Sequence, residues 1–119
     1  MNVKRGDVVL ADLPYSDRTA SKRRPALVVQ CDRNNRRLDD VIVALITSVT
    51  SRATRESTQL LIEADSDAGR ASGVLFDSTV KCEHLVTLNK RFIGRVVGRL
   101  PDDYIEKLNA CLKVSLGLV

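Results

Sequence analysis

Three cationic residues, Lys22, Arg23 and Arg24, stand directly before Pro25 and an apolar run at residues 26–29. Proline fixes its own φ and biases the preceding residue toward an extended conformation. The sequence therefore predicts that Arg24 is held at the entrance of a buried strand. A guanidinium group held there suits phosphate, because it offers paired planar donors and stays charged at any relevant pH. A solvated basic turn is the alternative interpretation of these residues.

Basic charge is concentrated in one part of the chain. The net charge is +4, but residues 18–37 carry seven basic side chains, Arg18 among them, against one aspartate. Such a local excess favours a polyanionic partner. Aromatic residues make up only 3% of the chain, and Tyr15 alone lies near the basic region. We therefore expect a site that reads a few bases through hydrogen bonds and arginine stacking, rather than a general single-strand coat protein.

The bulk composition excludes several classes of protein. A chain of 119 residues, 44% of them hydrophobic, is long enough for one compact core. It has no apolar run that would span a membrane and no signal-peptide pattern, so we expect a cytoplasmic protein. Cys31, Cys82 and Cys111 are widely spaced, which favours reduced thiols over a disulfide framework. Cys82 and His84 alone are too few ligands for a closed metal site, so we expect no metal.

Strand signals dominate the chain. Residues 102–116 place apolar side chains on one face at helical spacing, after Pro101, and predict one terminal helix. Polar loops are predicted at residues 15–24 and 32–37, and a turn region at 65–73. Six or seven strands with a single helix predict a mainly β (α+β) fold, a small closed or partly closed barrel. The predicted strands are residues 8–11, 26–30, 41–46 (buried on both faces), 59–63, 85–88 and 92–97, with a further irregular one from 74 to 82.

These segments, in this order, resemble the MazF/PemK family of toxin ribonucleases from bacterial toxin–antitoxin pairs. The resemblance runs nearly end to end and implies that residues 1–119 form a single toxin domain, an SH3-like barrel with a C-terminal helix. It also implies a homodimer that cuts single-stranded RNA without metal or cofactor and so inhibits translation and growth. An antitoxin with a largely disordered C-terminal segment would block the RNA groove. The resemblance rests on residues 4–8, 23–28, 46–48, 81–84 and 93–100, followed by the helix.

The resemblance also implies roles for individual residues. In metal-free cleavage the 2′-hydroxyl of the RNA is the nucleophile, and the products are a 2′,3′-cyclic phosphate and a 5′-hydroxyl. Arg24 resembles the family's catalytic arginine, which can clamp the nonbridging phosphate oxygens. Thr47 resembles the essential threonine, whose hydroxyl both donates and accepts, and Ser48 could assist. A strand-end hydroxyl bonded to the backbone is the alternative interpretation of Thr47.

Lys81, Glu83 and His84 depart from the family pattern, which commonly has arginine, aspartate and glutamine there. Strand alternation puts Lys81 and Glu83 on one face, where they could act as acid and base partners or form a surface ion pair. We expect Glu83 to be the general base, with His84 as the alternative; the sequence leaves open whether burial or Lys81 decides the pKa of Glu83. The residues expected to bind RNA are Arg18, Lys22, Arg23, Ser48 and His84.

Two other functions remain open. A gyrase-poisoning toxin of the CcdB type shares the barrel and has no catalytic activity, but its poisoning tip resembles a tryptophan-containing tail. This chain has no tryptophan and ends Leu116-Gly117-Leu118-Val119. A catalytically inactive module that keeps the antitoxin interface is the second alternative, because the residues at 81, 83 and 84 differ from the common pattern.

Overall fold

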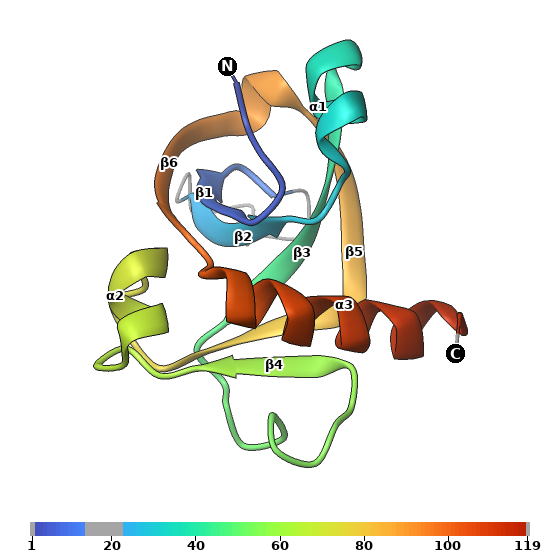
Figure 1. Ribbon diagram of the computed structural model, residues 1–119. Coiled ribbons are helices and arrows are strands. Elements are labelled where there is room, and N and C mark those ends of the chain that lie inside the picture. Colours follow the sequence, from blue (N-terminus) through green and yellow to red (C-terminus); the bar gives the residue numbers. More distant parts are fainter. Residues whose placement is uncertain (1, 14–22, 119) are drawn as a thin grey trace.

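Six antiparallel strands form one curled sheet, in the order β4-β5-β3-β2-β1-β6, in the computed structural model, which describes residues 2–13 and 23–118 (Figure 1). Three short helical segments and one long helix complete the described chain. The mainly β fold predicted from the sequence is confirmed, although β4 and β6 leave the sheet open. The strands are β1 (Asp7–Ala11), β2 (Arg24–Val28), β3 (Asp40–Thr47), β4 (Gln59–Ile62), β5 (Ser78–Asn89) and β6 (Ile93–Arg99).

Alternating side chains of the sheet build two separate hydrophobic clusters. Val8 of β1 and Leu27 of β2 are paired and belong to the first cluster, whereas their neighbours Val9 and Ala26 are paired and belong to the second. This follows from the two-residue period of a strand. Strand β3 contributes to both clusters, which confirms the prediction that both of its faces are buried.

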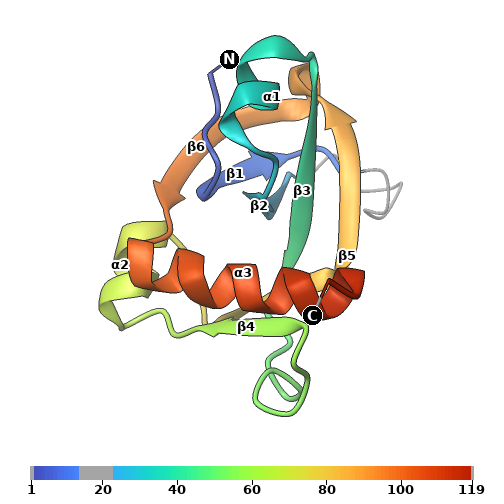
Figure 2. The same ribbon diagram turned by 45° about the vertical axis from the view of Figure 1, so that its right-hand side comes forward.

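The terminal helix α3 (Asp102–Leu116) has the predicted bounds and lies along β4 and across β5 (Figures 1 and 2). Leu108 and Cys111 are its buried residues, and two aspartates in its first turn complement the helix dipole. The helix ends at Gly117, which adopts a left-handed conformation, with φ 70°, that favours glycine. No helix in the described part of the chain is long and apolar enough to cross a membrane.

The predicted loop at residues 32–37 is wrong, because these residues form helix α1 (Asp32–Arg37). Polar contacts tie this helix to the residues just before it and to the start of the chain. The buried Asn35 side chain donates a hydrogen bond to the Gln30 carbonyl at 2.9 Å. The Asp32 carboxylate accepts a hydrogen bond from the Arg5 backbone N–H at 2.7 Å, which lowers the pKa of that carboxyl. A short polar helix of this kind has no apolar periodicity that the sequence could show.

The turn region predicted at residues 65–73 is also wrong, because most of it is helix α2 (Asp67–Ser72). The Ser66 hydroxyl caps this helix by accepting a hydrogen bond from the Gly69 N–H at 3.0 Å. Gly73 ends it in a left-handed conformation with φ 77°. The capping residue Ser66 and the terminating Gly73 can both be recognised in the sequence, but too few residues lie between them to predict a helix.

Strand β5 is longer than predicted and begins later. Residues 74–76 are not part of it, and it runs without interruption from Ser78 to Asn89, uniting two predicted segments. Its register on β3 shifts between Ala44 and Leu45, so residues 82–84 have no partner on β3. The 3-10 turn η1 (Lys90–Phe92) then leads into β6.

Most of the loop predicted at residues 15–24 lies outside the described residues, and Arg24 belongs to β2.

The three cysteines are free thiols; Cys31 is exposed, whereas Cys82 and Cys111 are buried between the sheet and α3. Burial raises the pKa of Cys82 to about 12 and also raises the pKa of Cys111. Both thiols are therefore protonated at neutral pH and act as core side chains, as the sequence predicted.

Candidate functional site

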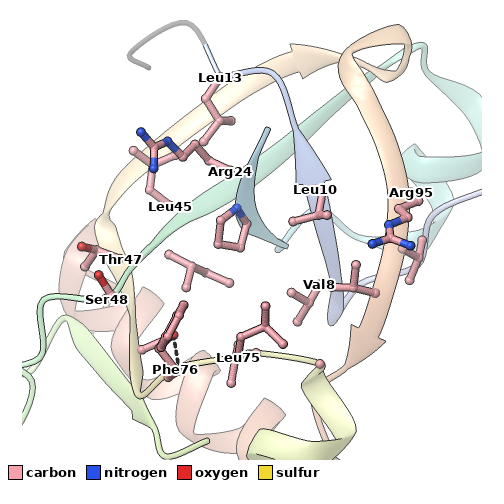
Figure 3. Close-up of a pocket in the computed structure, with 17 residues that line it drawn as sticks. Val8, Leu10, Leu13, Arg24, Leu45, Thr47, Ser48, Leu75, Phe76 and Arg95 are labelled. Atoms are coloured by element: carbon pink, nitrogen blue, oxygen red, sulfur yellow. Dashed lines mark hydrogen bonds between the residues drawn. The ribbon is translucent and has the colours of Figure 1, made fainter. Parts of the chain in front are cut away.

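A pocket of about 820 Å³ opens where the first residue of β2 lies near the last residue of β3 (Figure 3). This volume is in the usual range for ligand sites. Its polar side chains come from four strands and one loop: Arg24, Thr47, Ser48, Ser78 and Arg95. The rest of its lining is mostly apolar and includes Leu10 and Pro25 from the sheet and Leu75 and Phe76 from the segment before β5.

Arg24 occupies the strand entrance that the sequence predicted. It is the first residue of β2, it precedes Pro25, and it pairs with Ala11 of β1. Its side chain is exposed and has no hydrogen bond or ion pair with any described residue. The guanidinium group is therefore available for an anionic ligand in the pocket.

The sheet register brings Thr47 to Arg24. Ala26 pairs with Leu45, so the same register continued by two residues sets Arg24 opposite Thr47, and Figure 3 shows both residues on one side of the pocket. The Thr47 Oγ1 accepts a hydrogen bond from the Val49 N–H at 3.2 Å. This backbone contact was the alternative interpretation of Thr47, and it is present together with the pocket position. The hydroxyl keeps its own proton to donate to a ligand oxygen.

Arg23 does not line the pocket and is partly held in place. Its Nε is 3.9 Å from the Asp12 Oδ1, and its guanidinium rests against Gly94 of β6, where any side chain would overlap it. A glycine in β6 thus makes room for a cation from another part of the chain. Arg18 and Lys22, also predicted to bind RNA, lie outside the described residues.

Lys81 stands near Thr47 but does not line the pocket. Thr79 is the direct partner of Thr47 across the β3–β5 pair, and Lys81 is the next residue of β5 on the same face, opposite Leu45. A diagonal neighbour in an antiparallel pair lies roughly 7–8 Å away, within reach of a lysine side chain. Lys81 can therefore supply positive charge to a ligand bound at Thr47.

Glu83 lies further along β5 and faces β4. Its Oε2 accepts a hydrogen bond from Gln59 Nε2 at 2.7 Å, and its Oε1 accepts one from Thr58 Oγ1 at 3.3 Å. Burial raises the pKa of Glu83, but the hydrogen bonds and the charge of Lys81 outweigh burial and hold the pKa below its ordinary value. The carboxylate is ionised at neutral pH. His84 is half-buried beside it in the stretch of β5 that has no partner on β3.

The structure thus brings Arg24, Thr47 and Ser48 together and leaves Lys81, Glu83 and His84 on the neighbouring strand. Sequence reasoning missed Arg95 and Phe76, which also line the pocket. For Arg95, the signal was a charged residue inside the apolar run at residues 92–97. For Phe76, the signal was an aromatic residue between two polar segments, residues 65–73 and 77–78, in a chain that has four aromatic residues.

The described residues offer no metal centre. Within residues 2–13 and 23–118, no three histidine, cysteine, aspartate or glutamate side chains gather so that they could hold a metal ion. Cations and hydroxyls dominate the polar part of the pocket, which suits an anionic ligand such as a phosphodiester.

Comparison with known proteins gives consistent matches over nearly the whole chain. The sequence pattern of the PemK-like, MazF-like toxins of type II toxin–antitoxin systems matches residues 4–116. Endoribonuclease EndoA of Bacillus subtilis (strain 168) is 35% identical over 120 residues, which span 100% of this chain and 98% of that protein.

Solved structures share the fold. An endoribonuclease from mycobacterial species, in complex with its cognate antitoxin, gives a TM-score of 0.77 at 25% identity and covers 98% of this chain and 97% of its own. A MazE–MazF complex from Deinococcus radiodurans gives a TM-score of 0.73 at 21% identity, covering 98% and 97%. The predicted resemblance and fold are both confirmed.

Proposed function

We propose that this chain, which belongs to the family of PemK-like, MazF-like toxins of type II toxin–antitoxin systems, is an endoribonuclease that cuts single-stranded RNA at specific sequences without a metal ion. The observation that carries the proposal is the meeting of Arg24, Thr47 and Ser48 in one pocket. The match to an endoribonuclease over the full chain supports it. The substrate would be messenger RNA in the cytoplasm, so that cleavage inhibits translation and growth, and residues 1–119 would act as one domain.

The substrate supplies the nucleophile, and the pocket stabilises the transition state. The 2′-oxygen of the RNA attacks the adjacent phosphorus, the bond to the 5′-oxygen breaks, and a 2′,3′-cyclic phosphate and a 5′-hydroxyl form. Negative charge builds up on the nonbridging oxygens in the transition state. The Arg24 guanidinium binds these oxygens with paired donors. The Thr47 hydroxyl donates a hydrogen bond to one of them, and the hydrogen bond from the Val49 N–H fixes the orientation of the hydroxyl.

Lys81 and Glu83 complete the proposed site. Lys81 adds positive charge from the face that it shares with Thr47, and it is the proposed donor of the proton that the leaving 5′-oxygen takes up. Glu83 is the proposed acceptor of the 2′-hydroxyl proton, and its lowered pKa keeps it ionised but makes it a weaker base. His84, on the adjacent position, is the alternative acceptor. Ser48, Arg23, His84, Arg18 and Lys22 are proposed to contact the rest of the RNA.

The products of cleavage test the reaction. We expect the purified chain to cut single-stranded RNA in the presence of EDTA, leaving a 2′,3′-cyclic phosphate and a 5′-hydroxyl, because the nucleophile belongs to the substrate. Mass spectrometry of the fragments identifies both ends. Loss of cleavage on chelation, or 5′-phosphate ends, would refute the mechanism, and a complete lack of cleavage would favour the catalytically inactive module.

Substitution of Arg24 tests the charge stabilisation. Arg24→Ala should lower the cleavage rate about 10²-fold or more, because it removes the donors aimed at the developing charge. Arg24→Lys should recover little, since lysine lacks the planar fork. The matched control is Arg91→Ala, which removes an exposed arginine of η1 outside the pocket and outside the basic region at residues 18–37. A folded Arg24→Ala protein that turns over like the control would remove Arg24 from the reaction.

The pH dependence of kcat separates the two proton acceptors. If Glu83 is the base, the rate falls on acidification through a pKa below the ordinary 4.5 of the carboxyl, and Glu83→Gln abolishes most of the rate. If His84 is the base, His84→Gln abolishes most of the rate instead. Rates measured for both variants across the pH range decide between them. Unchanged rates in both would leave the reaction to Arg24 and Thr47.

We propose that the toxin is a homodimer and that a cognate antitoxin covers its RNA site. The solved relatives include one endoribonuclease in complex with its cognate antitoxin. The net charge of +4 and the basic region at residues 18–37 suit an acidic segment as well as RNA. Both ligands would then use the same cations.

Competition between the two ligands tests this assignment. Adding antitoxin at saturation should abolish cleavage, and excess uncleavable RNA should raise the apparent Kd of the antitoxin, because the two sites overlap. Fluorescence anisotropy of a labelled RNA measures both effects. Cleavage at the full rate in a complex that contains both ligands would contradict the proposal.

A further inference from the structure

Arg95 lies across the pocket from Arg24 (Figure 3). It belongs to β6 and pairs with Leu10 of β1, which also lines the pocket. Its side chain is exposed and has no hydrogen bond or ion pair with any described residue. The pocket therefore has an unpaired guanidinium on each side, and only one of them belongs to the proposed catalytic group.

An apolar surface fills the space between the two arginines. Leu10 and Pro25 line it from the sheet, and Leu75, Phe76 and Val96 border it with 84%, 70% and 40% of their surface exposed. Large apolar side chains that gather on a surface usually mark a binding site. An aromatic ring at the edge of such a pocket can stack on a planar group of a ligand.

This arrangement of charge and apolar surface matches the chemistry of single-stranded RNA. An unpaired strand presents phosphate, base and phosphate in turn, and proteins bind it with cations for the backbone and aromatic side chains for the bases. The strand must also pass Arg24 and Thr47 for cleavage to occur there. The pocket continues from these residues to Phe76 and Arg95.

We propose that Arg95 is a positioning residue for the RNA, and that it binds a phosphodiester one or two nucleotides from the cut. The base between this phosphodiester and the cut lies against Leu75 and Phe76. This inference rests on the proposed function and adds to it the path of the strand. Strands β2 and β6 are separated by β1 alone, so their backbones lie roughly 10 Å apart.

A positioning residue and a catalytic residue differ in their kinetic effects. Arg95 lies away from the reacting phosphate, so its loss should weaken binding of the RNA equally in the ground state and the transition state. Arg95→Ala should therefore raise KM about tenfold and leave kcat nearly unchanged. Phe76→Ala should raise KM by a similar factor, because it removes the surface on which the base stacks. Arg24→Ala, by contrast, should mainly lower kcat.

The experiment uses the full chain and a short RNA centred on a cleavage site mapped on a long transcript. KM and kcat are measured for Arg95→Ala and Phe76→Ala. The matched controls are Arg91→Ala and Phe92→Ala, which remove exposed side chains outside the pocket and outside the basic region at residues 18–37. Each phosphodiester is then replaced in turn by a neutral methylphosphonate, in an RNA made uncleavable by a 2′-deoxy nucleotide at the cut. Replacing the one phosphodiester that Arg95 binds should weaken RNA binding to the unsubstituted protein. The same replacement should not weaken RNA binding to the Arg95→Ala protein any further.

The outcomes distinguish this inference from the function on which it rests. If the unsubstituted protein cuts RNA but Arg95→Ala behaves like Arg91→Ala, the inference is wrong and the proposed function stands. If Arg95→Ala weakens only antitoxin binding or dimerisation, the surface serves a protein partner and the inference is also overturned. If the unsubstituted protein neither binds nor cuts RNA, both fail. Should Arg95→Ala not fold, Arg95→Gln and the methylphosphonate series on the unsubstituted protein give the same decision.

Discussion

The antiparallel register of β2, β3 and β5 is the constraint on which the site depends. Ala26 pairs with Leu45, and Leu45 pairs in turn with Lys81, so a single row of residues crosses three strands. The next row on the same face contains Thr47 and Thr79 and, with the register continued, Arg24. A slip of one residue would turn Thr47 and its neighbours to the other face. The two hydrophobic clusters prevent that slip, since β3 contributes side chains to both.

The pocket leaves several groups without partners among the described residues. Neither Arg24 nor Arg95 has an ion pair with a described residue, and Leu75 and Phe76 keep most of their surface in water. Arg99 and Arg70, by contrast, are paired: Arg99 lies 3.6 Å from Asp7, and Arg70 lies 2.6 Å from Asp67. Unpaired cations and exposed apolar side chains in one place give a surface that a ligand with both characters can cover.

Glu83 shows how neighbouring strands adjust a side chain. Its partners, Thr58 and Gln59, come from the end of the preceding loop and from β4, and they stabilise the charged form of the carboxylate. The pKa is lowered, so the ionised state predominates at neutral pH and is lost only on acidification through that pKa. Arg24 differs, because its charge does not depend on pH in the relevant range. The proposed site thus combines a constant cation with an acceptor that is ionised at neutral pH.

The sequence by itself determined the strand content, the terminal helix and the position of Arg24 at a strand entrance. The helical spacing of the apolar side chains and Pro101 together place α3 at residues 102–116. Pro25 places Arg24 at a strand entrance. Both signals are local in the sequence. It did not determine α1 and α2, because both are short and polar, and α1 is also held by Arg5, a residue far away in the chain. Only the tertiary structure decided that Arg95 and Phe76 share a pocket with Arg24, whereas Glu83 faces β4. The physical reason is that strand pairing and sheet curl set the distances between residues far apart in the chain, and neither is encoded in the local pattern.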